Sequence, residues 1–166
     1  SPPQLINTWK GNCHRSFDRL KWGDEVEYVI LSFDDKEKRV RLCLRAPEVL
    51  AALQTAENEA LHTGHGLDEL KSIWRPEYGS FMVEGTPGVP YGHLVDDLLT
   101  VEGNMLARRK EVQQLLRSGE AIISLTHFPH LGVGDFVDPP CIPGGPIAKS
   151  QFVPDEIINP HPRFAT

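Results

Sequence analysis

The pattern of hydrophobic and polar positions predicts a β-hairpin near the start of the chain. The segment from about Asp24 to Phe33 is rich in apolar and aromatic side chains, which is typical of a half-buried or fully buried strand. Residues 34–38 form a charged turn, and residues 39–44 alternate polar with apolar side chains. Two strands joined by a short charged turn indicate a hairpin.

Apolar residues spaced three and four positions apart predict two helices. The first is expected from Pro47 to about Glu57, because proline is favoured in the first helical turn. A polar loop at 58–72 follows it. The second is expected from about His93 to Ser118, and Gly119 ends it. Its predicted buried face consists of Leu94, Leu98, Val101, Met105, Val112, Leu115 and Leu116.

The remaining pattern predicts the α+β fold class. Strands are expected at about 74–84 and 121–126, and residues 132–146 form a loop rich in proline and glycine. Residues 1–20 show weak periodicity, which predicts a mobile terminus or a short helix. Strands separated by helices could form a parallel doubly wound sheet. The hairpin, and the lack of a glycine-rich phosphate loop after the first strand, instead favour a mainly antiparallel sheet.

Two glutamates on the first strand are candidate metal ligands. Glu25 and Glu27 are two residues apart, so their side chains share one face with Cα atoms roughly 6 to 7 Å apart. Ionised carboxylates on a partly buried strand need a cation or hydrogen-bond donors beside them. Lys21 is the only basic residue nearby in the sequence. A bound divalent metal is therefore a candidate, and oxygen-only ligands favour magnesium or manganese over zinc.

A second acidic pair, Glu77 and Glu84, lies in the next predicted strand. Their spacing of seven would place them on opposite faces of an uninterrupted strand. A bulge at Gly79 would bring both carboxylates to one face, and four glutamates could then converge. For each pair alone, the competing interpretation is an ordinary solvated charge on a strand or loop.

Composition narrows the class of protein. Forty per cent of the 166 residues are hydrophobic and 24% are charged, which is typical of one globular domain. The net charge of −6 argues against nucleic-acid binding, and the basic run Arg108–Lys110 is expected on a solvated face. No apolar run approaches the ~20 residues that cross a membrane. Three widely spaced cysteines fit a reducing compartment, which predicts a cytoplasmic protein.

Several long motifs resemble a known enzyme family. They are Lys21 to Tyr28, Trp74 to Pro87, Tyr91-Gly92, Val101-Glu102, Asn104-Met105, Arg108-Arg109-Lys110, Phe152 to Glu156 and His161 to Phe164. Together they resemble the eukaryotic catalytic subunit of glutamate-cysteine ligase, and motifs of this length are more specific than one short pattern. The resemblance predicts that residues 18–166 are an N-terminal portion of the ligase catalytic domain and that 1–17 are an atypical N-terminal segment.

The resemblance implies a fold, a reaction and a set of ligands. The fold would belong to the glutamine synthetase-like superfamily, with helices packed on one face of the sheet. The reaction would join the side-chain carboxylate of glutamate to the amine of cysteine at the expense of ATP, through γ-glutamyl phosphate, in the first step of glutathione biosynthesis. Residues matching Glu25, Glu27, Glu77 and Glu84 would hold Mg²⁺ or Mn²⁺. The partner would be a modifier subunit in a heterodimer. Because the family's chain is several times longer, this chain alone is expected to be inactive.

Two other functions stay open. Paired strand carboxylates also suit a glycoside hydrolase, with ~5.5 Å between the carboxyl groups for retaining chemistry and with Trp22 or Trp74 as a sugar platform. That interpretation leaves the second glutamate pair unexplained. The other possibility is a non-catalytic, truncated subunit that binds the modifier subunit or a full-length chain and regulates it.

Overall fold

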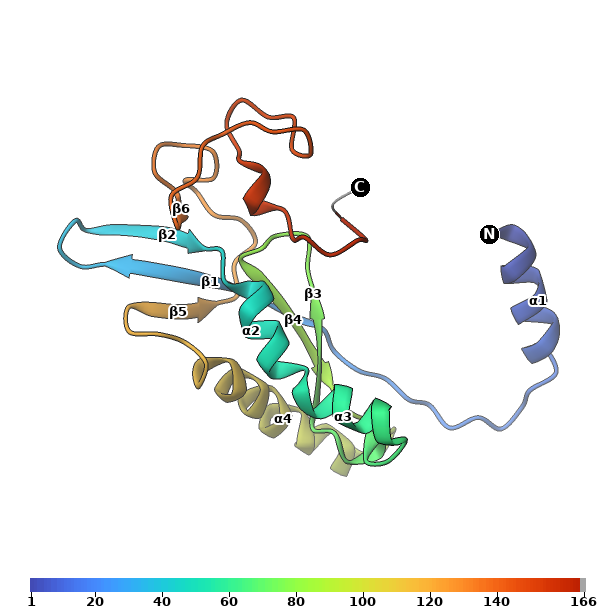
Figure 1. Cartoon of the computed structure of the whole chain (residues 1–166). Helices are drawn as coiled ribbons and strands as arrows, with labels where there is room; N and C mark the ends of the chain where they lie inside the picture. Colours follow the sequence, from blue (N-terminus) through green and yellow to red (C-terminus); the bar gives the residue numbers. More distant parts are fainter. Residues whose placement is uncertain (165–166) are drawn as a thin grey trace.

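The computed structural model describes residues 1–164 and shows a curled β-sheet with helices on one of its faces (Figure 1). Ala165 and Thr166, at the end of the predicted domain 18–166, lie outside the described residues. The elements are α1 (Pro2–Asn12), β1 (Val26–Asp34), β2 (Arg39–Cys43), α2 (Ala46–Leu53), α3 (Thr55–Thr63), the 3-10 helix η1 (Leu67–Glu69), β3 (Ser72–Pro76), β4 (Met82–Pro87), α4 (Val95–Gln113), β5 (Glu120–Ile123), β6 (Val137–Asp138) and the 3-10 helix η2 (Asp155–Ile157).

The six described strands form one mixed sheet. Its order is β3-β4-β1-β2-β6, and β5 also pairs with β1. Every pairing is antiparallel except that of β2 with β6. The α+β class is therefore confirmed, and the sheet is mainly antiparallel as predicted, with one parallel pairing at the β6 edge that makes it mixed. The sequence did not indicate β6 because this strand has only two residues and lies within the proline- and glycine-rich loop at 132–146.

The first predicted hairpin is confirmed, and the predicted kinked strand is wrong. In the first hairpin, Leu31 pairs with Leu42. The Asp34 carboxylate accepts hydrogen bonds from the backbone N–H groups of Lys36 and Glu37, with N···O distances of 3.0 Å. The segment expected as one strand at 74–84 is instead a second hairpin, β3 and β4, joined by five residues. No bulge at Gly79 is needed, because the chain reverses there.

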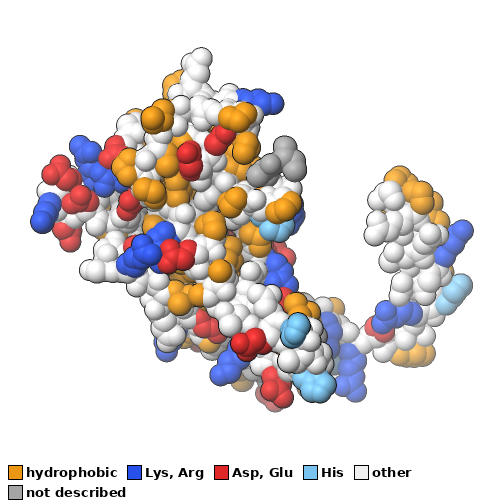
Figure 2. Space-filling view, viewed as in Figure 1, with side chains coloured by type: hydrophobic (Ala, Val, Ile, Leu, Met, Phe, Trp, Pro, Cys, Tyr) orange, Lys and Arg blue, Asp and Glu red, His pale blue; other side chains and the backbone are white. Residues whose placement is uncertain are grey.

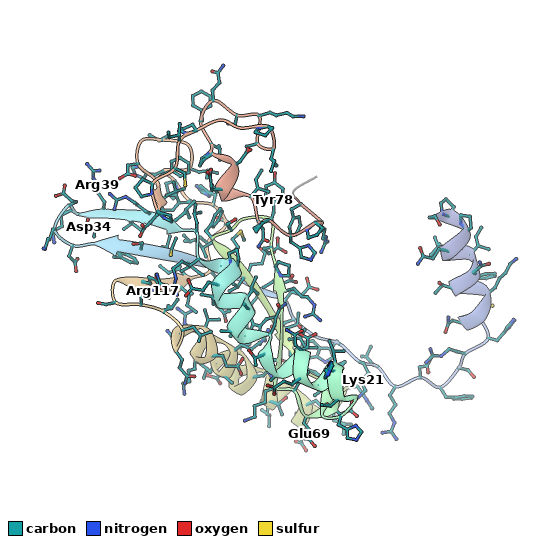
Figure 3. All side chains as sticks on the ribbon, in the orientation of Figure 1. Lys21, Asp34, Arg39, Glu69, Tyr78 and Arg117 are labelled. Carbon is teal, nitrogen blue, oxygen red and sulfur yellow. The ribbon has the colours of Figure 1, made fainter. Side chains whose placement is uncertain are left out.

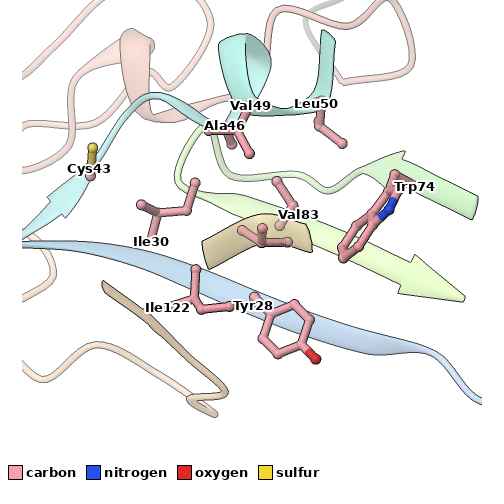
Figure 4. Packing of buried hydrophobic residues seen from close by; sticks show 10 residues of the cluster. Tyr28, Ile30, Cys43, Ala46, Val49, Leu50, Trp74, Val83 and Ile122 are labelled. Atoms are coloured by element: carbon pink, nitrogen blue, oxygen red, sulfur yellow. The ribbon is translucent and has the colours of Figure 1, made fainter. Parts of the chain in front are cut away.

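The helical core lies on one face of the sheet (Figure 4). Even-numbered residues of β1, Tyr28 and Ile30, point to this face, as does Trp74 of β3. The same cluster contains residues of the other strands and of two helices: Val83, Ile122 and Cys43 from the strands, Ala46, Val49 and Leu50 from α2, and Val112 from α4. Full burial of each large side chain contributes roughly 1.5 to 3 kcal/mol. Helix α2 ends at Leu53, so the first predicted helix is divided in two, and α3 occupies part of the predicted loop.

Helix α4 and the residues after it bury only the C-terminal part of the face that the apolar spacing predicts: Val112 lies in the helical core, and Leu115 and Leu116 pack against it. Leu94, Leu98 and Met105 are exposed. The inward positions include Asn104, which donates to the carbonyl oxygen of Lys71 at 3.0 Å. They also include Arg108, which is fully buried, so the predicted solvated face is wrong at that residue. Hydrogen bonds to strand and loop carbonyls thus set the rotation of this helix.

An irregular C-terminal segment covers the other face of the sheet. Odd-numbered residues of β1, Val29 and Leu31, pack there with Leu42 of β2. The residues of the C-terminal segment that bury them are Phe136, Val137, Ile157 and Ile158. This cover lies over the second half of β1, where the odd positions are apolar.

Helix α1 stands apart from the rest of the molecule (Figure 1). None of its residues is buried. The chain joins the sheet domain at Trp22, which forms an isolated β-bridge with Tyr91. The short helix, one of the two outcomes that the sequence leaves open for residues 1–20, is present. No helix within residues 1–164 is long and apolar enough to cross a membrane.

Candidate metal centre

Glu25, Glu27 and Glu84 are placed on one face by strand geometry. Glu25 and Glu27 share parity with Val29, so they point to the sheet face opposite the helices. In the register of β1 and β4, Glu27 lies directly opposite Glu84. Directly opposed residues have Cβ atoms about 4.5 to 5.5 Å apart. The two strands therefore bring like charges face to face.

The second hairpin brings Glu77 toward the same group. Arg75 of β3 is paired with Glu84 of β4. Glu77 lies two residues after Arg75, just past the end of β3, so the alternation of side chains directs it to the same side. A hairpin, and not the predicted bulge at Gly79, therefore brings Glu77 to the same face as the other glutamates.

Electrostatics link Glu84 to the other three carboxylates. Burial raises the pKa of Glu84, and the charges of Glu25, Glu77 and Glu27 raise it further, together with hydrogen bonding to Glu77. A carboxyl surrounded by carboxylates holds a proton more readily, because its ionised form is repelled. Glu84 is the common neighbour of the other three.

Among the described residues, no basic side chain forms an ion pair with any of the four glutamates. Arg75, the cross-strand neighbour of Glu84, directs its guanidinium to Glu57 of α3, with two hydrogen bonds of 2.7 and 2.6 Å. These bonds raise the pKa of Arg75. Lys21, which the sequence placed near the cluster, is exposed and forms no ion pair with another described residue. Figure 3 shows Lys21 at the opposite end of the second hairpin from Tyr78, the neighbour of Glu77.

The donor set suits a hard cation, but the site is not closed. All four groups are carboxylates, the ligand type that Mg²⁺ and Mn²⁺ prefer. Within residues 1–164, no three His, Cys, Asp or Glu side chains are arranged so that they could hold a metal ion as they stand. A cavity of about 510 Å³ opens beside Glu25. A cation would have to draw the carboxylates together to be held.

The aromatic side chains do not support a sugar platform. Trp74 is buried in the helical core, on the other face of the sheet from the glutamates. Trp22 packs against Tyr91, with 4.8 Å between ring centroids, and donates its indole N–H to the carbonyl oxygen of Gly92 at 2.8 Å. The geometry therefore weighs against the glycoside hydrolase interpretation.

Sequence reasoning missed the arginine beside the cluster. Arg75 stands two residues before Glu77, so the alternation of a strand could have placed it on the acidic face. Its ion pair with Glu57 depends on how α3 packs beside the edge strand β3, which no local pattern indicates.

Comparison with known proteins identifies the family. Residues 2–166 match the family model described as glutamate-cysteine ligase. This chain belongs to the glutamate-cysteine ligase family. The matched range includes residues 2–17, and the division of the chain at residue 17 stays a prediction.

Named members of the glutamate-cysteine ligase family show the same similarity. The glutamate-cysteine ligase catalytic subunit of Homo sapiens is 45% identical in an alignment of 166 positions that covers 98% of this chain and 25% of the human protein. The catalytic subunit of Mus musculus is 44% identical over the same shares. The glutamate-cysteine ligase of Dictyostelium discoideum is 42% identical over 163 residues, 98% of this chain and 24% of that protein. The chain thus spans about a quarter of the length of these relatives.

Proposed function

We propose that this chain supplies the metal-binding part of an ATP-dependent glutamate-cysteine ligase. The observation that supports this most directly is the acidic face: in a chain of this family, burial and the charges of three neighbouring glutamates raise the pKa of the partly buried Glu84 carboxyl. The reaction would join the side-chain carboxylate of glutamate to the amine of cysteine and form γ-glutamylcysteine. We also place the fold in the glutamine synthetase-like superfamily on the basis of this family membership.

The four glutamates would hold the cation that accompanies ATP. Glu25, Glu27, Glu77 and Glu84 would be the ligands of Mg²⁺ or Mn²⁺, and the bound cation would neutralise charge on the nucleotide phosphates. Without a cation, Glu84 holds its proton more readily than an isolated carboxyl does, because burial and the neighbouring carboxylates raise its pKa. Metal binding must therefore displace that proton, which makes the affinity rise with pH.

The chemistry itself requires no nucleophile from the protein. Phosphoryl transfer from ATP to the side-chain carboxylate of glutamate would give γ-glutamyl phosphate and ADP. The amine of cysteine would then attack the activated carbonyl carbon and release phosphate. The role of the chain in both steps is to position ligands and stabilise charge.

We propose that the whole protein works with partners that this chain does not contain. The names of the human and mouse relatives describe a catalytic subunit. By the same logic, a modifier subunit would complete a cytoplasmic heterodimer. Because the described part of the acidic face offers only Arg75 as a cross-strand cation, and Glu57 occupies it, we expect no ligase activity from the 166 residues alone.

Metal titration tests the proposal. Calorimetric titration of Mg²⁺ into the chain should show binding, and Glu84→Gln or Glu27→Gln should weaken it at least tenfold, because each removes a charged ligand. Glu59→Gln is the matched control, since Glu59 is an exposed glutamate on α3, away from the acidic face. Equal affinity in the wild type and in both ligand variants would reject the assignment.

A further inference from the structure

Helix α4 carries an apolar surface that nothing in the described molecule covers. Val95, Leu99 and Leu106 lie on one side of the helix, opposite the inward residues, and Val95 and Leu99 are 73% and 77% exposed. Leu98 and Met105 flank them and are also exposed. We call these five side chains the outer stripe. Two of its members, Leu98 and Met105, belong to the face that the apolar spacing of this helix predicted to be buried.

A glycine on the exposed part of α4, Gly103, is explained by no contact in the described domain. A Cβ atom on Gly103 would meet nothing within 4 Å. Glycine in the middle of a helix is unfavourable by about 1 kcal/mol relative to alanine. A position of this kind allows a second helix to approach closely, but the described domain provides no such neighbour.

Helix α1 presents the complementary feature. Leu5, Ile6 and Trp9 fall on one face, with the free Cys13 one turn further on, and Leu5 is 72% exposed. Figure 2 shows hydrophobic side chains on the surface of this detached helix. An isolated helix of 11 residues is marginally stable in water, because most helical stability comes from packing of the apolar face. Helix α1 therefore needs a partner surface.

The tether is long enough for α1 to reach the outer stripe. Trp22 and Tyr91 exchange backbone hydrogen bonds of 3.1 and 2.7 Å, and α4 begins at Val95, four residues after Tyr91. The linker at 13–21 can therefore extend about 30 Å from a point close to the start of α4. At ~1.5 Å per residue, α1 and the outer stripe each run about 16 Å. The two surfaces match in length and lie within reach.

Charge favours the same contact. The basic side chains of residues 1–21 are Lys10, Arg15, Arg19 and Lys21, against the single acid Asp18. The first half of α4 carries only acids, namely Asp96, Asp97 and Glu102. Opposite charges on the two segments would draw them together and set their orientation.

We propose that α1 folds back onto the outer stripe of α4 in the same chain and forms an N-terminal clasp. The short tether raises the local concentration of α1 to about the millimolar range, so a contact within one chain is favoured over one between chains. The shortest path of the linker places α1 antiparallel to α4, with Cys13 near Val95 and Leu5 near Leu106. The clasp would also fix the segment that leads from Trp22 to Glu25 and would thereby steady the edge of the acidic face.

Disulfide trapping tests both the contact and its direction. Under mild oxidation, a Val95→Cys variant should form a disulfide with Cys13 inside a monomer, whereas Leu106→Cys should not. Leu61→Cys on α3 is the control, since Leu61 is also exposed but lies on another helix. A disulfide that joins two chains, or equal trapping at all three positions, would overturn the clasp.

Fluorescence of Trp9 gives an independent measurement. The difference between the wild type and Trp9→Phe isolates the emission of Trp9, which acrylamide should quench weakly when the clasp is closed. Leu99→Asp should increase this quenching several-fold, and Leu61→Asp should leave it unchanged. Both positions are exposed in the domain, so both variants should keep the circular dichroism of the wild type. Strong quenching of Trp9 in the wild type, unaltered by Leu99→Asp, would refute the proposal.

Discussion

The buried ion pair between Asp24 and Arg108 allows a quantitative prediction. The Arg108 guanidinium is fully buried and donates to the Asp24 carboxylate and to the carbonyl oxygen of Gly85, both at 2.5 Å. Tyr91 also donates its hydroxyl to Asp24 at 2.9 Å. Asp24→Ala would leave the arginine charge without its partner in the interior.

The size of the effect follows from burial. Breaking a buried pair by removing one partner lowers the free energy of unfolding by roughly 3 to 5 kcal/mol. The Asp24 side chain is 22% exposed. Water can therefore reach the vacated position, and we expect about 3 kcal/mol, the lower end of that range. For a chain of this size, that loss lowers the melting temperature by roughly 6 to 12 °C.

Urea unfolding, followed by tryptophan fluorescence, measures the loss. The double variant Asp24→Ala/Arg108→Met removes the charge as well as its partner, so it should recover most of the stability. Asp18→Ala is the control: Asp18 pairs with Arg15 at the exposed surface, and its loss should change the stability by less than about 1 kcal/mol. If Asp24→Ala is as mild as this control, or if the double variant is no more stable than the single one, the reasoning from an uncompensated buried charge is refuted.

Two further predictions concern the acidic face and one turn. The pKa of Glu84 is raised in the folded state, so the fold loses stability as pH rises through the range just above the ordinary glutamate value. Without divalent metal, Glu84→Gln should be more stable than the wild type by about 0.5 to 1 kcal/mol near pH 7, and this gain should vanish below about pH 4, as urea unfolding at the two pH values would show. A Cβ atom on Gly88 would lie 1.8 Å from the carbonyl oxygen of Leu70. Gly88→Ala should therefore destabilise the fold by at least about 1 to 3 kcal/mol in thermal unfolding, whereas Gly103→Ala should not destabilise it.

The elements set by local pattern could be predicted from the sequence. The first hairpin followed from alternation along β1 and β2 and from the charged turn between them. The shared face of Glu25 and Glu27 followed from the same alternation. For Glu77 and Glu84, the prediction that both side chains lie on one face was right, but the predicted cause was wrong. A bulged strand and a hairpin can both put these two side chains on the same face of the sheet, and the structure has the hairpin.

The elements set by distant contacts could not be predicted. The rotation of α4 depends on Asn104 and Arg108, whose acceptors lie on residues 71 and 85. From the spacing of apolar residues alone, polar residues such as these are predicted to face solvent. The pairing of β2 with β6 likewise joins segments that are far apart in the chain, over two residues only. That the four glutamates hold metal stays a proposal.

Strand β1 carries both core residues and candidate metal ligands, so its pairing register affects both folding and function. Its even positions enter the helical core, and its odd positions run from glutamates to apolar side chains. A slip of one residue in its pairing would drive Glu27 under α2 and α4 and turn Tyr28 and Ile30 outward. A buried carboxylate would make the misregistered sheet unstable, so the acidic side chains would favour the correct strand register during folding.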